Sequence, residues 1–288
     1  MEIRHYCNAS IPCTLEDHRG QLYYFPYKFG SVLAPEQWFA NSKEDIYNVI
    51  ENYWSYSIYV SVFYVLSVQV VQRAMESRKA FELKMPLIIW NALLAVFSLV
   101  GTIRMGEEFL HVISTRPLVD SISYAYDPHQ PAVFWAFCFS ISKFFELGDT
   151  MFVLLRKKPL IFLHWYHHAV VLVYAWHCTK EIVAGARWYV FMNYAVHTLM
   201  YTYYAVSAAG IRLPRLLSMV ITSLQTIQMF IGVAISFIVF YYKLQGRVMQ
   251  QTYENLFFSF AIYASFAILF SNFFNKSYLK EKEQKKIQ

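Results

Sequence analysis

The sequence predicts an all-α, polytopic membrane protein with seven transmembrane helices. Its 288 residues are 57% hydrophobic and only 15% charged, and the apolar residues form long blocks rather than amphipathic stripes. Each block is close to the ~20 residues that a helix needs to cross the hydrocarbon core of a bilayer. Because a helix satisfies its own backbone hydrogen bonds in lipid, we interpret the blocks as membrane helices and exclude a soluble domain.

The apolar runs follow an aromatic-rich N-terminal segment. The predicted membrane helices are residues 54–72, 87–110, 131–155, 160–179, 188–210, 216–242 and 254–274. We therefore divide the chain into an N-terminal segment, residues 1–52, a membrane domain, residues 53–275, and a polar tail, residues 276–288.

The positions of Lys and Arg predict the orientation in the membrane. Basic residues concentrate in the connections after the first, third and fifth runs and in the C-terminal tail. By the positive-inside rule these parts lie in the cytosol, which places the N-terminal segment in the lumen. This topology accounts for the formal net charge of +6, so the charge does not indicate binding to nucleic acid.

Short patterns near both ends agree with this orientation. Asn8 begins an Asn-Ala-Ser sequon and is a candidate glycosylation site. Lys285 and Lys286 stand fourth and third from the end, which is the dilysine pattern for retrieval to the endoplasmic reticulum. Cys7 and Cys13 could pair in the lumen. The sequence contains no CxxC pair that would indicate a zinc site. We expect a multi-pass protein of the endoplasmic reticulum membrane with a lumenal N-terminus and a cytosolic C-terminus.

Three histidines share one face of the fourth predicted helix. His164, His167 and His168 stand at i, i+3 and i+4, so their side chains project from the same side. Ionisable groups are costly inside a bilayer and tend to mark functional sites. An imidazole can serve as a base, an acid, a nucleophile or a metal ligand.

Other polar residues lie at a similar depth in neighbouring helices. At a rise of about 1.5 Å per residue, all of them fall on the order of 5–20 Å inside the cytosolic interface. Individually they could be an ion pair within one helix or hydrogen bonds between helices, but the common depth favours a site. Arg104 lies in the opposite half of its run and has no assigned role. The residues of the shared layer are Lys143, Glu146, Asp149, Asn193, His197, Tyr201, Tyr204, Gln225 and Gln228.

Four stretches of this layer together resemble the ELO family of very-long-chain fatty acid elongases. They are Lys143-Phe-Phe-Glu146-Leu-Gly-Asp149-Thr150, the box His164-Trp-Tyr-His167-His168, Asn193-Tyr-Ala-Val-His197 with the following Tyr201 and Tyr204, and Gln225-Thr-Ile-Gln228. All four occur in family order, and the resemblance covers roughly residues 50 to 280. It implies seven helices that enclose an acyl-chain tunnel.

The resemblance also implies an activity, that of a 3-oxoacyl-CoA synthase. Such an enzyme condenses an acyl-CoA with malonyl-CoA and releases CO2 and CoA. His167 would attack the thioester, His197 would assist the decarboxylation of malonyl-CoA, and His164 and His168 would orient and donate. Which histidine is the nucleophile and which the base stays open.

The resemblance implies further substrate contacts. Asn193 and Gln225 are candidate donors to a carbonyl or oxyanion, and no metal or other cofactor is expected beside malonyl-CoA and acyl-CoA. The candidates for the phosphates of CoA are basic residues near the cytosolic mouth. These are Lys143, Arg156, Lys157 and Lys158, and the other substrate-binding candidates are Glu146, Asp149, Tyr201, Tyr204 and Gln228.

The residue before the histidine box bears on the substrate. Family members that act on saturated and monounsaturated chains tend to have a residue other than Gln there, and this chain has Leu163. We expect acyl-CoA substrates of C16 to C18 and leave polyunsaturated chains open. The expected partners are membrane lipid and the reductases and dehydratase of the elongation cycle, and a homo-oligomer is also open.

Two other classes of protein stay in consideration. A His-x-x-His-His box also occurs in di-iron membrane desaturases and hydroxylases, but those centres draw on several boxes and this sequence has one. A receptor or transporter with seven helices and no catalytic activity is the second alternative. The clustering of polar residues near one face of the membrane argues against it.

Overall fold

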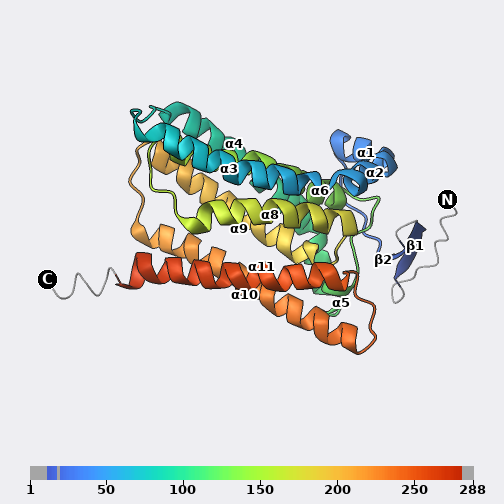
Figure 1. Ribbon diagram of the computed structural model, residues 1–288. Coiled ribbons are helices and arrows are strands. Elements are labelled where there is room, and N and C mark those ends of the chain that lie inside the picture. Colours follow the sequence, from blue (N-terminus) through green and yellow to red (C-terminus); the bar gives the residue numbers. More distant parts are fainter. Residues whose placement is uncertain (1–11, 18–19, 281–288) are drawn as a thin grey trace.

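The computed structural model describes residues 12–17 and 20–280, most of which lie in a bundle of long helices (Figure 1). The helices of the bundle are α3 (Tyr56–Glu76), α4 (Lys84–Thr115), α6 (Pro131–Glu146), α7 (Gly148–Leu155), α8 (Phe162–Glu181), α9 (Ala186–Ala208), α10 (Arg215–Leu244) and α11 (Tyr253–Phe274). A π-helical segment, η1 (Asn275–Lys280), extends α11. Each predicted apolar run falls on these helices, and the prediction of an all-α membrane domain is confirmed.

Among the described residues, four helices are long and apolar enough to cross a membrane. They are α3, α4, α10 and α11 with most of η1. The third predicted run is divided at Leu147 into α6 and α7. In α8 and α9 the polar residues of the predicted site lower the hydropathy. The structure therefore supports a multi-pass membrane protein, and the full set of seven spans stays a prediction.

The helices pack in pairs around a common interior. α4 lies along α9, α10 along α11, and α8 contacts α3, α6 and α11. At Gly101 the helices α4 and α9 approach so closely that a Cβ atom would lie 2.6 Å from the ring of Tyr194. The hydroxyl of Tyr194 donates a hydrogen bond of 2.9 Å to the carbonyl of Trp135 on α6. These contacts bring α4, α6 and α9 together.

The N-terminal segment folds against one end of the bundle (Figure 1). Its strands β1 (Cys13–Asp17) and β2 (Gly20–Tyr24) form an antiparallel hairpin. The helices α1 (Ala34–Asn41) and α2 (Lys43–Tyr53) follow, and the short helix α5 (Asp120–Ser123) lies at the same end. Tyr24 pairs with Ala125, just beyond α5. The sequence analysis predicted none of these elements.

A buried ion pair anchors α1 to the bundle. Glu36 accepts hydrogen bonds of 2.8 and 2.7 Å from the guanidinium of Arg104 on α4, and one of 2.7 Å from the indole of Trp135 on α6. It also accepts a bond of 2.7 Å from the backbone N–H of Leu33, which satisfies a free donor at the start of α1. Arg104, a charge that the sequence left without a role, therefore belongs to the attachment of the N-terminal segment.

Some sequence predictions lie outside the described residues. They are the sequon at Asn8, the pairing of Cys13 with Cys7, because Cys7 is not described, and the retrieval signal at Lys285 and Lys286.

Candidate active site

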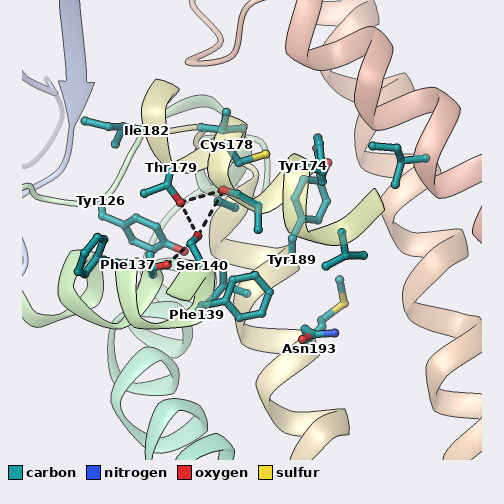
Figure 2. Close-up of a pocket in the computed structure, with 18 of the residues that line it drawn as sticks. Tyr126, Phe137, Phe139, Ser140, Tyr174, Cys178, Thr179, Ile182, Tyr189 and Asn193 are labelled. Atoms are coloured by element: carbon teal, nitrogen blue, oxygen red, sulfur yellow. Dashed lines mark hydrogen bonds between the residues drawn. The ribbon is translucent and has the colours of Figure 1, made fainter. Parts of the chain in front are cut away.

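Two cavities meet inside the bundle. The polar cavity is lined by the four candidate histidines and by residues of α7, α9 and α10, and it encloses about 1440 Å³ with the open space at its mouth included. The apolar cavity extends from there toward the N-terminal segment, encloses about 980 Å³ and is lined largely by apolar and aromatic side chains (Figure 2). His167 and Gln228 line both cavities, so they lie at the junction.

The histidine box occupies the first turns of α8. The ring centroids of His164 and His168 are 4.7 Å apart, and those of His167 and His168 are 5.4 Å apart. His167 also packs on Phe266 of α11 at 5.0 Å. The buried Nε2 atom of His164 has no hydrogen-bond partner among the residues described. All three rings line the polar cavity, as their spacing on one helical face predicts.

Asp149 fixes the wall of the polar cavity next to the box. One carboxylate oxygen accepts a bond of 2.6 Å from the indole of Trp90 on α4, and the other accepts one of 2.7 Å from the hydroxyl of Tyr201 on α9. The second oxygen also lies 4.0 Å from Nε2 of His168. Gly148 permits this arrangement, because a Cβ atom there would lie 2.8 Å from the Trp90 ring. Asp149 thus ties α4, α7 and α9 together beside the histidines.

His197 is held by a buried network that begins on α6. Lys143 donates to both oxygens of Glu146, at 2.7 and 2.9 Å, and to the side-chain oxygen of Asn193 at 3.0 Å. The amide nitrogen of Asn193 is 3.2 Å from Nε2 of His197, and Nδ1 of that ring is 3.8 Å from Glu146. Ser142 completes the network with a bond of 3.0 Å to Glu146.

Lys143 and Glu146 serve this network rather than the substrate directly. Both are only 3% exposed, and neither lines the polar or the apolar cavity. An ammonium group has three donors, and Lys143 uses them on Glu146 and Asn193. It therefore has no donor left for a phosphate of CoA, and its place in the structure is behind Asn193 and His197.

The remaining candidates divide into those that line the polar cavity and one that does not. Tyr204, Gln225, Arg156 and Lys158 line it. Lys157 instead donates to the backbone carbonyls of residues 76 and 78, at 3.1 and 3.0 Å. Of the three basic residues after α7, two are thus placed to meet a ligand in this cavity.

Comparison with known proteins identifies the family that carries this site. Residues 49–286 match the ELO family, described as the GNS1/SUR4 family. The chain belongs to the ELO family. It is 44% identical to the putative fatty acid elongase 4 of Caenorhabditis elegans over 264 residues, which cover 91% of this chain and 87% of that protein. It is 40% identical to the human very long chain fatty acid elongase 3 over 244 residues, covering 84% and 90% of the two chains.

Membership of the ELO family favours an elongase over the two other classes considered. Within the described part of the chain, no group of three or more His, Cys, Asp or Glu side chains is placed to hold a metal ion. The box of this ELO protein lines the polar cavity together with Gln225 and Gln228 of α10, whereas Asn193 lines the apolar cavity.

The sequence analysis missed Trp90 as a member of the site. Trp90 lies in the apolar run of α4, where an aromatic residue is ordinarily a packing or interfacial residue. The hydrogen bond to Asp149 distinguishes it, and that contact spans 59 positions in the chain. The sequence indicated Asp149 because a carboxylate is costly in lipid, whereas the indole of Trp90 is not unusual there.

Proposed function

We propose that the chain catalyses the condensing step of fatty acid elongation, with His167 as the residue that carries the acyl group. Membership of the ELO family supports a 3-oxoacyl-CoA synthase. The observation that carries the role of His167 is its place at the junction of the polar and apolar cavities. A thioester held there has its acyl chain in the apolar cavity and its CoA in the polar one.

In the first step the imidazole of His167 acts as the nucleophile. Its free nitrogen lone pair attacks the thioester carbonyl, the C–S bond breaks, and CoA leaves as a thiolate that takes a proton from water. The acyl group remains on the ring as an acyl-imidazolium. Gln228 at the junction and the unpartnered nitrogen of His164 are suited to stabilise the oxyanion of this step.

In the second step malonyl-CoA enters the polar cavity after CoA has left. Loss of CO2 leaves the electron pair of the broken C–C bond on the enolate of acetyl-CoA. The enolate carbon attacks the acyl carbon, and His167 departs as neutral imidazole. His197, which the network of Asn193 and Glu146 holds in place, would orient the malonyl group and stabilise the enolate.

The basic residues that line the polar cavity support an orientation in the membrane. We propose that α3, α4, α6 with α7, and α8 to α11 supply seven spans, with the polar cavity open to the cytosol at Arg156 and Lys158. The protein would lie in the endoplasmic reticulum beside the reductases and dehydratase of the cycle. Its acyl-CoA substrates would be C16 to C18 chains.

A two-stage experiment with purified protein tests the role of His167. With palmitoyl-CoA alone, the protein should release about one CoA per active site and gain the mass of the acyl group on the peptide that contains His167. With malonyl-CoA added, 3-oxoacyl-CoA and CO2 should form. In His167→Ala the rate of CoA release from palmitoyl-CoA alone and the rate of 3-oxoacyl-CoA formation should both fall by roughly a thousandfold or more, as is seen when an enzyme loses its nucleophile.

The matched control is His111→Ala, which removes an exposed histidine on α4. Turnover by this variant should equal that of the wild type. A folded His167→Ala protein that still forms 3-oxoacyl-CoA at a comparable rate would show that the acyl group is carried elsewhere.

A further inference from the structure

The apolar cavity ends at the N-terminal segment. Along α8 it runs from His167 to Thr179, twelve positions apart, a distance of about 18 Å at the rise of an α-helix. Phe39 of α1 and Ile50 of α2 also line the cavity. Figure 1 places α1 and α2 at the end of the bundle opposite the C-terminus, where α6 begins and α8 ends.

The contacts of Phe39 fix this end of the cavity. Its ring packs on Phe134 and Phe137 of α6, with centroids 5.6 and 5.3 Å apart, and it is only 2% exposed. Ile50 is 1% exposed and belongs to the same buried cluster. α6 runs antiparallel to α8, since Ser140 contacts Thr179 and Phe144 contacts Trp176, so the first turns of α6 lie toward the end of α8 and away from His167. Phe39 and Ile50 therefore line the part of the apolar cavity that is distant from His167.

The Glu36 ion pair holds α1 in this place. Burial opposes ionisation of the carboxyl group, but hydrogen bonds from Arg104, from the N–H of Leu33 and from Trp135 outweigh it and lower the pKa of Glu36. The carboxylate is therefore charged at neutral pH and pairs with Arg104 through two bonds. α1 is fixed to α4 and α6 rather than resting loosely on the bundle.

We propose that α1 and α2 form the end wall of the acyl cavity and limit the length of the acyl chain that the enzyme accepts. The inference rests on the proposed function, since it assigns the apolar cavity to the acyl chain. The match to the ELO family begins at residue 49, so α1 and most of α2 precede the part that defines the family.

A rigid wall discriminates between chains by excluded volume. A chain that is too long must bend, displace Phe39 or withdraw its thioester from His167. In a hydrophobic pocket one methylene group changes discrimination by roughly tenfold or more. Shortening the wall residue should therefore shift the accepted length while the chemistry at the other end continues.

The test compares two adjacent aromatic residues of α1. Phe39 lines the cavity, whereas Trp38 is 62% exposed. For each alanine variant, formation of 3-oxoacyl-CoA is measured with palmitoyl-, stearoyl-, arachidoyl- and behenoyl-CoA. In Phe39→Ala the ratio of turnover with behenoyl-CoA to turnover with palmitoyl-CoA should rise by roughly tenfold or more. In Trp38→Ala the ratio should equal that of the wild type.

A second variant, which should change the turnover ratio in the opposite direction, keeps the test decisive if Phe39→Ala does not fold. Ala136 lines the same cavity on α6, next to Phe137, and Ala136→Leu should lower the ratio by a similar factor. Turnover by either folded variant with an unchanged ratio overturns the end wall and leaves the proposed function standing. Absence of 3-oxoacyl-CoA from the wild type with all four substrates would instead refute the proposed function, and the wall with it.

Discussion

The two ends of the cavity system are built in different ways. At the polar end, the Lys143–Glu146 ion pair and its hydrogen bonds hold Asn193 and His197 in place, and Asp149 lies 4.0 Å from His168. At the apolar end, the side chains of Phe39 and Ile50 belong to a buried hydrophobic cluster and contact their surroundings by apolar packing. Directional bonds suit a reaction that needs defined atomic positions, whereas packing suits selection by length. The comparison predicts that changes at the polar end alter rates and changes at the apolar end alter the preferred chain.

Each end nevertheless contains one buried ion pair. Lys143 and Glu146 are both 3% exposed, and Arg104 and Glu36 are 8% and 2% exposed. The first pair lies behind His197, and the second attaches α1. Similar interactions therefore serve different parts of the molecule: one holds the network around His197, and the other attaches α1.

The largest expected effect is at the polar end, in His197→Ala. Loss of a group that takes part in proton transfer or charge stabilisation lowers kcat by about 10²–10⁴-fold. The ratio of turnover with behenoyl-CoA to that with palmitoyl-CoA should stay unchanged, because the apolar cavity is intact. Release of CoA from palmitoyl-CoA alone should survive better than product formation, since His197 is assigned to the malonyl step.

The two stages are separated by rapid mixing with and without malonyl-CoA. If His197→Ala lowered the rate of CoA release and the rate of product formation equally, His197 would act in the acyl-transfer step and not with malonyl-CoA. Variant His111→Ala, exposed on α4, again serves as the control.

The second prediction compares the stability and the catalytic properties of Glu146→Gln with those of Glu36→Gln. Removing one partner of a buried ion pair costs about 3–5 kcal/mol in stability because the other charge remains buried. We expect both variants to lose stability on this scale, which thermal unfolding in detergent measures. Their catalytic effects should differ: Glu146→Gln lowers kcat with an unchanged chain-length ratio, whereas Glu36→Gln keeps turnover of palmitoyl-CoA and changes the ratio.

Glu82→Gln, at an exposed position before α4, is the matched control and should change neither quantity. If Glu36→Gln lowered the rate for every acyl-CoA alike, the attachment of α1 would matter for stability and not for selection. That result would contradict the prediction that changes at the apolar end alter the preferred chain length rather than the rate.

The same contrast explains what could be predicted from the sequence. The histidines, Asp149 and Asn193 were identified because ionisable and amide groups stand out in apolar runs, where they are costly. Nothing in the sequence distinguishes Phe39 in this way, because aromatic residues are common in many environments. Its contact with Phe137 joins segments about a hundred residues apart, and no local pattern encodes it. The division of the third predicted run into α6 and α7 at Leu147 was also missed, although Gly148 follows directly after the break.

The third prediction concerns the close approach of α7 and α4. In Gly148→Ala the new Cβ atom would lie 2.8 Å from the Trp90 ring, so the indole must move away from Asp149. Such overpacking costs about 1–3 kcal/mol in stability. kcat should fall with the chain-length ratio unchanged. Gly185→Ala is the control, because its Cβ atom would lie at an ordinary 3.4 Å from Tyr189.

The smallest expected effect is at the mouth of the polar cavity. Arg156 and Lys158 line the cavity, whereas Lys157 between them donates to backbone carbonyls at the end of α3 and just after it. Exposed charge pairs contribute about 0.2–1 kcal/mol, so Arg156→Gln and Lys158→Gln should each raise KM for acyl-CoA by up to roughly fivefold. Added salt should reduce the difference from the wild type, because it screens charges at the surface. Lys157→Gln has the same change of charge in the same loop, so an equal rise in KM there would mean that the mouth attracts CoA by net charge and not through the two residues that line it.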